Sequence, residues 1–213
     1  MVKTIIFDFD GTLADSFPLV LKVQQKVARK FGYKVIFYDL GLREKRFVDI
    51  LKEEGELRSN LSLLRFLSRF QRAFDEVVEE IRLFSGFQEL LHELNVVRGF
   101  ELGLLSTNIS HHSLEHIEHV LARENVLQYF SFLRHASVFV GKKYALRGIL
   151  KERNLSPKDV LYVGDEVDDF FSCRRVGISF VGVGWGVHSK AFLERSGVKK
   201  VILKREDLLK ILK

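Results

Sequence analysis

Two aspartates, Asp8 and Asp10, stand one residue apart at the end of an apolar run in the segment VKTIIFDFDGTLADS. The run VKTII is rich in β-branched residues, which predicts a buried strand. In an extended chain, residues i and i+2 point to the same side, so the two carboxylates lie together. Two such charges repel each other unless a cation or a shared proton offsets them. The motif therefore indicates a site for a metal ion, a substrate or both.

The later part of the chain, from about residue 86, alternates segments of helical periodicity with short apolar runs. We expect helices over residues 86–99, 111–126, 142–154, 168–177 and 205–212. We expect strands within residues 100–108, 130–134, 156–166, 178–184 and 199–203. Strands separated by helices of this length favour right-handed crossovers, so the predicted fold class is α/β with a doubly wound parallel sheet.

Residues 17–84 have a different pattern, with helical periodicity and hardly a strand signal. Apolar residues recur every three or four positions at Val20, Val23, Val27 and Phe31, and again at Leu64, Leu67, Phe70, Phe74, Val77 and Ile81. The first strand matches the later sheet in composition. We therefore predict a core made of residues 1–16 and 85–213, with residues 17–84 inserted as an all-helical cap.

Polar residues follow three of the predicted strands, in the segments DFDGT, LLSTN and VGDEVDD. In an open parallel sheet the ligand binds at the carboxyl ends of the strands. The three segments are therefore expected to meet at one site. An ordinary turn would explain a single Asp-Gly pair, but it would not explain polar residues at the ends of the other two strands.

Four segments in this order, DFDGTLADS, LLSTN, VGKKYAL and GDEVDD, resemble the four motifs of the haloacid dehalogenase (HAD) superfamily. More narrowly, they resemble its phosphoglycolate-phosphatase-like members, which carry a helical cap after the first motif. The resemblance covers nearly the whole chain. It implies a Rossmann-like core and a magnesium-dependent phosphatase of small phosphomonoesters, with phosphoglycolate as the nearest family substrate.

The acidic residues at the strand ends fit a magnesium site. A phosphate dianion repels an attacking carboxylate, so a divalent cation is needed between them. Mg²⁺ prefers oxygen ligands in octahedral geometry. The Asp8 carboxylate, the backbone carbonyl of Asp10 and the Asp165 carboxylate are the expected ligands. Asp169 is expected to hold either a metal-bound water or Lys142.

Two further acids, Glu166 and Asp168, are weaker candidates for contact with the metal shell. Asp8 is the expected nucleophile, which would form an aspartyl-phosphate. Asp10 is the expected general acid for the leaving group and then the base for the hydrolytic water. The resemblance gives the same roles to the first and second aspartates of the motif.

Phosphate binding is expected from Gly11, Ser106, Thr107 and Asn108, with Thr12 in a supporting role. The segment STN departs from the commoner family form, in which one hydroxyl residue precedes the asparagine, so the choice between Ser106 and Thr107 stays open.

The catalytic cation is expected to be Lys142, which follows Gly141 as in the family's Gly-Lys pattern. The neighbouring Lys143 is the alternative.

Two other patterns in the sequence could suggest a binding site. His112, His116 and His119 fall on one helical stripe whose spacing can bind zinc, but the opposite stripe is apolar, so we expect these histidines to face water. The segment GVGWGVHS lacks the spacing of a dinucleotide-binding loop. We expect it to form a flexible loop beside the active site.

The composition constrains the setting and the partners. The net charge is +6 with a pI near 9.4, but the basic residues are scattered, which favours a small phosphorylated metabolite over nucleic acid. The single cysteine, Cys173, excludes an internal disulfide and fits a reducing cytoplasm. No signal peptide or membrane span is evident at the start or elsewhere. A monomer or small homo-oligomer is expected.

Four other functions compete with this interpretation. A sugar-phosphate mutase or a dehalogenase would share the superfamily, although the dehalogenases we considered lack an acid at the position of Asp10. A nucleic-acid-acting phosphatase or a non-catalytic binding domain would belong to other classes. The complete set of motifs argues against a non-catalytic domain, and the scattered charge argues against nucleic acid.

Overall fold

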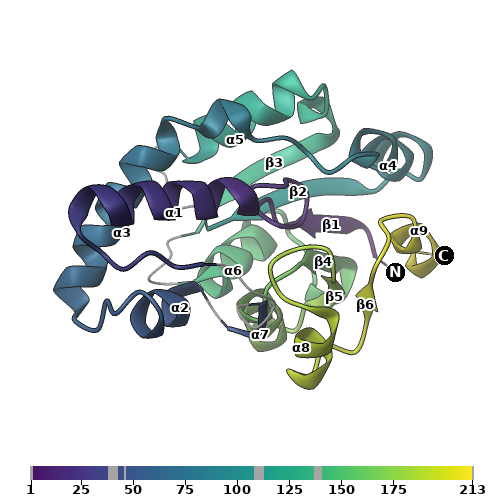
Figure 1. Cartoon of the computed structure of the whole chain (residues 1–213). Helices are drawn as coiled ribbons and strands as arrows, with labels where there is room; N and C mark the ends of the chain where they lie inside the picture. Colours follow the sequence, from purple (N-terminus) through teal and green to yellow (C-terminus); the bar gives the residue numbers. More distant parts are fainter. Residues whose placement is uncertain (1, 38–42, 46, 108–112, 137–140, 213) are drawn as a thin grey trace.

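A central parallel sheet organises the computed structural model, which describes residues 2–37, 43–45, 47–107, 113–136 and 141–212. The described strands are β1 (Thr4–Phe7), β2 (Glu101–Ser106), β3 (Phe130–His135), β4 (Val160–Gly164), β5 (Ser179–Val183) and β6 (Val201–Ile202). They form one six-stranded sheet in the order β3-β2-β1-β4-β5-β6, and all pairs are parallel (Figure 1). The predicted α/β fold class is confirmed.

Helices cover both faces of this sheet, and β1 is therefore buried on both sides. Ile5 and Phe7 pack with α4 (Phe87–His92), α5 (Ser113–Arg123) and α9 (Asp207–Ile211). Ile6, which points to the opposite face, packs with α6 (Lys142–Glu152) and α7 (Val167–Val176). A smaller cluster joins α7 to α8 (Lys190–Arg195). This two-residue alternation explains why β1 reads as a continuous apolar run.

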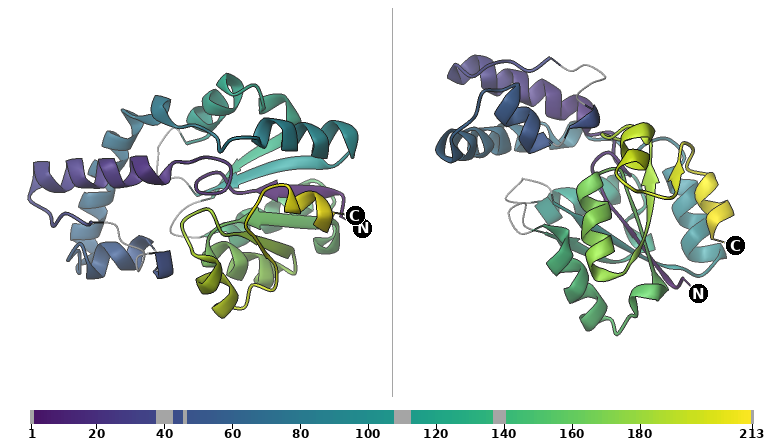
Figure 2. Two further views of the ribbon diagram at one scale, coloured as in Figure 1. Left: turned by 45° about the vertical axis from the view of Figure 1, so that its right-hand side comes forward. Right: turned by 90° about the horizontal axis from the view of Figure 1, so that it is seen from below.

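The segment between β1 and α4 is helical and lies beyond the carboxyl ends of the strands, as Figures 1 and 2 show. It contains α1 (Phe17–Phe31), α2 (Phe47–Glu53), α3 (Asn60–Asp75) and a 3₁₀ turn, Val78–Glu80. We call residues 17–84 the cap segment. Its interior includes Phe66, Phe70 and Phe74, whose rings stack in sequence at 6.1 and 5.8 Å between centroids. The boundaries of an independent cap domain stay a prediction.

The two stretches of chain that connect the cap segment to the sheet lie side by side. Ala14 and Leu83 form an antiparallel bridge. The Asp15 N–H donates to the Arg82 carbonyl, and the Phe84 N–H donates to the Leu13 carbonyl, both at 2.9 Å. The joint is therefore a short two-stranded ribbon.

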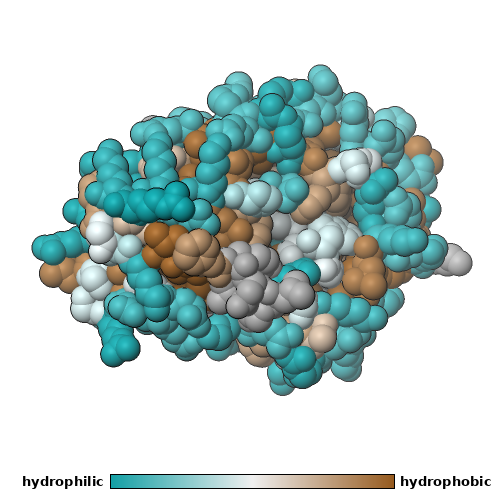
Figure 3. All heavy atoms as spheres, in the orientation of Figure 1, coloured by the Kyte–Doolittle hydropathy of each residue, from teal (hydrophilic) through white to brown (hydrophobic). Residues whose placement is uncertain are grey.

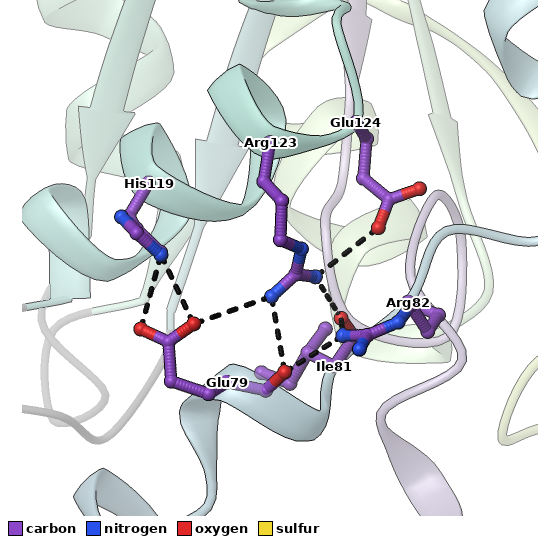
Figure 4. A network of polar contacts seen from close by, with 6 residues as sticks. All are labelled: Glu79, Ile81, Arg82, His119, Arg123 and Glu124. Atoms are coloured by element: carbon purple, nitrogen blue, oxygen red, sulfur yellow. Dashed lines mark hydrogen bonds and ion pairs between the residues drawn. The ribbon is translucent and has the colours of Figure 1, made fainter.

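A polar network from α5 supports this joint (Figure 4). The Arg123 guanidinium donates to the backbone carbonyls of Glu79 and Ile81 and also contacts the Glu79 carboxylate. The same carboxylate meets the His119 ring at 3.0 Å. Because Arg123 binds main-chain atoms, it fixes the path of the chain leaving the cap segment.

Several predicted elements differ from the structure. The helix containing Leu64 ends at Asp75, so Val77 and Ile81, although buried, lie just before and just after the 3₁₀ turn and not in the helix. The helix predicted over 86–99 is regular only over Phe87–His92 and continues as a π-helical turn, Glu93–Val97. Helix α8 was not predicted, because its six residues are too short for a periodic signal.

The surface of the described residues is mostly hydrophilic on the face shown in Figure 3. The apolar side chains lie in patches between the hydrophilic ones. Across the described residues, no helix combines the length and apolar character needed to span a membrane.

The aromatic stack in the cap segment generates a stability prediction. Phe70 is 3% exposed, so Phe70→Ala should lower the free energy of unfolding by about 3–5 kcal/mol because it leaves a cavity between two rings. Leu61 is 58% exposed on the same helix, and Leu61→Ala should change it by less than about 0.5 kcal/mol. Urea unfolding followed by circular dichroism measures both. Equal losses in the two variants would contradict this packing.

Candidate active site

The first acidic residue of the site follows β1 directly. The Asp8 N–H donates to the Val163 carbonyl at 2.9 Å, which continues the pairing with β4 beyond the strand. The chain then turns, and the Phe9 carbonyl accepts from the N–H groups of residues 12–14. Gly11 has φ +71°, and a Cβ there would overlap the Asp165 carboxylate. Glycine is required because the turn presses against a second strand end.

A buried ammonium group joins the acidic residues. Lys142 Nζ lies 2.8 Å from Asp8 Oδ1 and 2.8 Å from Asp169 Oδ2, and the side chain is 3% exposed. Burial opposes its charge, but Asp169 and Asp8 outweigh that cost and raise the pKa of Lys142. Lys143 instead places its ammonium over the Tyr144 ring. Of the two candidate lysines, Lys142 is the one that reaches the strand ends.

Asp169 lies in the first turn of α7 and contacts Lys142, which is one of the two partners expected for it. Burial raises the pKa of its carboxyl well above the usual value, and Lys142 offsets part of that rise. Glu166 immediately precedes the helix; burial, with Asp165 adding to it, raises its pKa to about 8. Asp168 lies in the same first turn of α7.

Asp165, at the end of β4, is fully buried beside Asp8. Its Oδ1 accepts from the Thr12 hydroxyl at 2.9 Å, and its Oδ2 accepts from the Val187 N–H at 2.7 Å. Burial, followed by the charge of Asp8, raises its pKa to about 7. Asp8 and Asp165 flank the point where the strand order reverses, which is where open α/β sheets bind ligands.

Asp10 carries a buried oxygen, Oδ1, that has no hydrogen-bond partner among the described residues. Burial raises the pKa of this carboxyl to about 6; hydrogen bonding to Ser16 opposes the rise and the charge of Asp8 adds to it. Ser106, 1% exposed at the end of β2, lies close enough to lower the pKa of the Asp10 carboxyl slightly. Thr107 is half-buried, and Asn108 lies outside the described residues.

The chemistry of these groups fits Mg²⁺. The Asp8 and Asp165 carboxylates lie close enough for the charge of one to raise the pKa of the other. A divalent ion would offset their repulsion. In the described part of the chain, no three His, Cys, Asp or Glu side chains are gathered to hold a metal. That finding is compatible with two carboxylates and one backbone carbonyl, from Asp10, as the protein ligands.

The glycine-rich segment lies beside the site, where it was expected. The Trp185 indole N–H donates to the Thr12 carbonyl at 3.1 Å, and a Cβ at Gly186 would overlap Gly11 and Asp165. The contacts of Val187 with Asp165 and of Trp185 with Thr12 were not predicted from the sequence. The only available clue was the cluster of glycines, which permits a close backbone approach.

Of the two described histidines in the stripe, His119 faces water as expected, with 55% of its side chain exposed, and His116 is half-buried, with 23% exposed. His116 pairs with Asp75 at 3.8 Å and His119 with Glu79 at 3.0 Å, so both contact the cap segment. His112 lies outside the described residues. Within the part of the chain that the structure describes, these histidines belong to no metal-binding group.

Comparisons with known proteins show which sequences and folds this chain is similar to. Residues 5–183 match the family model described as haloacid dehalogenase-like hydrolase. A phosphoglycolate phosphatase of Synechococcus elongatus is 34% identical over 194 residues, covering 90% of this chain and 88% of that protein. A phosphorylated carbohydrates phosphatase of Thermotoga maritima is 28% identical, covering 100% and 99%. A haloacid dehalogenase-like hydrolase of Streptococcus pneumoniae shares the fold, with a TM-score of 0.84 at 19% identity, covering 100% and 99%.

The raised pKa of Asp165 generates a prediction about metal and pH. Its folded-state pKa of about 7 exceeds the usual value of about 4, so the folded protein binds this proton more tightly than the unfolded chain. Without metal, this contribution to stability is present below about pH 4 and is lost as the pH rises through about 7. Mg²⁺ needs the deprotonated carboxylate, so its affinity should rise over the same window.

We therefore expect Mg²⁺ to raise the melting temperature more at about pH 8 than at about pH 5. Thermal scans with and without the ion measure this difference, and Asp165→Asn should remove most of it. An equal shift at both pH values in the unaltered protein would count against a metal at this carboxylate.

Proposed function

The chain belongs to the haloacid dehalogenase-like hydrolases, and on that basis we propose that it is a Mg²⁺-dependent phosphatase of small phosphomonoesters that forms an aspartyl-phosphate on Asp8. The observation that carries the proposal is the buried Lys142 ammonium held between Asp8 and Asp169 at 2.8 Å from each. It anchors a carboxylate at the carboxyl end of β1, beside two further buried acids.

The position of Asp8 supports the proposed covalent catalysis. Its Oδ1 accepts from Lys142 and from the Phe9 N–H at 2.8 Å, which orients the carboxylate. A carboxylate oxygen bonds to phosphorus while the bond between phosphorus and the ester oxygen breaks. The Lys142 ammonium and the Ser106 hydroxyl are the groups we assign to the charge on the phosphoryl oxygens. Mg²⁺, when bound by Asp8, Asp165 and the Asp10 carbonyl, would offset charge between the phosphate and the nucleophile.

Proton transfer is assigned to Asp10. In the first half-reaction, the Asp10 carboxyl donates its proton to the leaving ester oxygen. The carboxylate then takes a proton from the water that attacks phosphorus, which releases phosphate and restores Asp8. A pKa of about 6 suits both directions near neutral pH. The unpartnered Oδ1 is available for this transfer.

The substrate class is inferred from the relatives and from the cap segment. The matched relatives are named phosphoglycolate phosphatase and phosphorylated carbohydrates phosphatase. We propose that the substrate of this chain is a small phosphorylated metabolite, and phosphoglycolate is the first compound to test. A helical segment beyond the strand ends would close over such a molecule and exclude water and polymers. A cytoplasmic location and a monomer or small homo-oligomer belong to the same proposal.

A substrate panel tests this function. With Mg²⁺ present, phosphoglycolate and sugar phosphates should be hydrolysed faster than a phosphopeptide or a 3′-phosphorylated oligonucleotide. Asp8→Asn should reduce turnover at least about 10³-fold, as removal of a nucleophile does. The matched control is Asp207→Asn, at an exposed ion pair on α9, which should keep full activity. Release of phosphate by Asp8→Asn at the unaltered rate would end the proposal.

The dual role of Asp10 makes a separate prediction. Asp10→Asn should slow turnover by about 10²- to 10⁴-fold because proton transfer is lost. Its Mg²⁺ affinity should remain close to that of the unaltered protein, since the proposed ligand is the backbone carbonyl. Kinetics and titration calorimetry separate the two effects. Lost metal affinity in a folded variant would move Asp10 from proton transfer to coordination.

A further inference from the structure

An arginine of the cap segment, Arg43, reaches the glycine-rich loop that follows β5. Arg43 Nη2 donates to the carbonyls of Gly184 at 3.0 Å, Gly186 at 2.8 Å and His188 at 3.5 Å. Its Nε donates to the Val187 carbonyl at 3.2 Å. We call residues 184–188 the glycine loop. One guanidinium therefore donates hydrogen bonds to four carbonyl oxygens of this loop.

The opposite side of the glycine loop contacts the acidic site. The Val187 N–H donates to Asp165 Oδ2 at 2.7 Å, and the Trp185 indole N–H donates to the Thr12 carbonyl at 3.1 Å. Gly186 is packed so closely against Gly11 and Asp165 that no Cβ would fit. The glycine loop thus lies between Arg43 and the groups that surround Asp165.

Other contacts fasten the same cap turn to the loop. His188 is 2% exposed, and its Nδ1 accepts from the Val167 N–H at 3.0 Å. The proton of the neutral ring is therefore on Nε2, which donates to the Lys45 carbonyl at 3.2 Å. The Ser189 N–H donates to the Arg43 carbonyl at 3.3 Å. Glu44 pairs with Arg195 at 2.5 Å. Residues 43–45 therefore meet the glycine loop, and Ser189 and α8 that follow it, through both main chain and side chains.

Converging carbonyls need a donor at their centre. Four carbonyl dipoles directed at one point repel one another, and a planar guanidinium, with several N–H groups, satisfies them together. The same peptide orientations direct the Val187 N–H toward Asp165. If the guanidinium is removed, the carbonyls are expected to turn toward water, and rotation of the peptide planes would take that N–H away from the carboxylate.

We propose that Arg43 is a positioning residue of the active site, which orders the glycine loop and through it orients Asp165 and Thr12. The proposal rests on the function proposed above. Because Arg43 belongs to the cap segment, its contacts with the loop exist only when residues 43–45 lie against the sheet domain. Closure over a substrate would then complete the acidic site in the same movement, and opening would loosen it.

The chain carries its own reporter for this test. Trp185 is the single tryptophan, and it belongs to the glycine loop. Arg43→Gln should shift its fluorescence emission to longer wavelength, because the indole loses its fixed contact and meets more water. Titration calorimetry should show Mg²⁺ affinity reduced about tenfold, as for other groups that orient a metal ligand. With p-nitrophenyl phosphate, kcat should fall more than KM rises.

Two further variants sharpen the comparison. Arg43→Lys keeps the charge but cannot reach four carbonyls, so it should lie between Arg43→Gln and the unaltered protein in all three measurements. Lys26→Gln removes an exposed ion pair to Glu76 within the cap segment and should change none of them. Arg43→Gln with unaltered emission, metal affinity and kcat would overturn the proposal, as would equal effects from Lys26→Gln.

The tests of Arg43 and of the overall function can fail separately. If the unaltered protein hydrolyses no phosphomonoester, the proposed function fails, while emission and metal affinity still judge Arg43. If the protein is an active phosphatase and Arg43→Gln matches it, only the positioning role fails.

Discussion

The contact on which the site depends is the one between a buried ammonium and two buried carboxylates. Lys142 lies between Asp8 and Asp169, and all three side chains are nearly excluded from water. Each charge alone would be expensive to bury, but together they satisfy one another. The sheet makes this possible, because parallel strands deliver their carboxyl ends to one edge, where α6 and α7 also begin. Fold and charge pairing therefore support each other.

The remaining acids show the consequence of that arrangement. One lysine offsets only part of the negative charge, so the pKa values of Asp165 and Asp10 remain raised, first of all by burial. The uncompensated charge is what a divalent cation and a phosphate would share. Because the negative charge of these acids is only partly offset, an N–H group that donates to Asp165 is important. The glycine loop supplies such a group beside Asp165.

Much of the site could be predicted from the sequence because its residues follow strands whose apolar runs are unmistakable. Asp8, Asp165 and Ser106 lie at strand ends as expected. Lys142 was preferred over Lys143 from the sequence, and the structure agrees, because only the Lys142 side chain points to the strand ends. The contacts of His116 and His119 with Asp75 and Glu79 of the cap segment were not predicted, because the sequence of α5 does not reveal that this part of the chain lies against it. Arg43 had no local signal, since its partners are main-chain atoms more than a hundred residues away.

The paired passages at the joint of the cap segment also bear on how such a chain could have diversified. Ala14 and Leu83 are bridge partners, so an insertion of nearly seventy residues leaves and returns at almost the same point. For the sheet, that insertion is equivalent to a hairpin loop with fixed ends. The entropy cost of closing a loop grows only slowly with its length, so insertions of other sizes could occupy this place at little expense to the core. The catalytic edge could then be retained while the element that faces the substrate is exchanged.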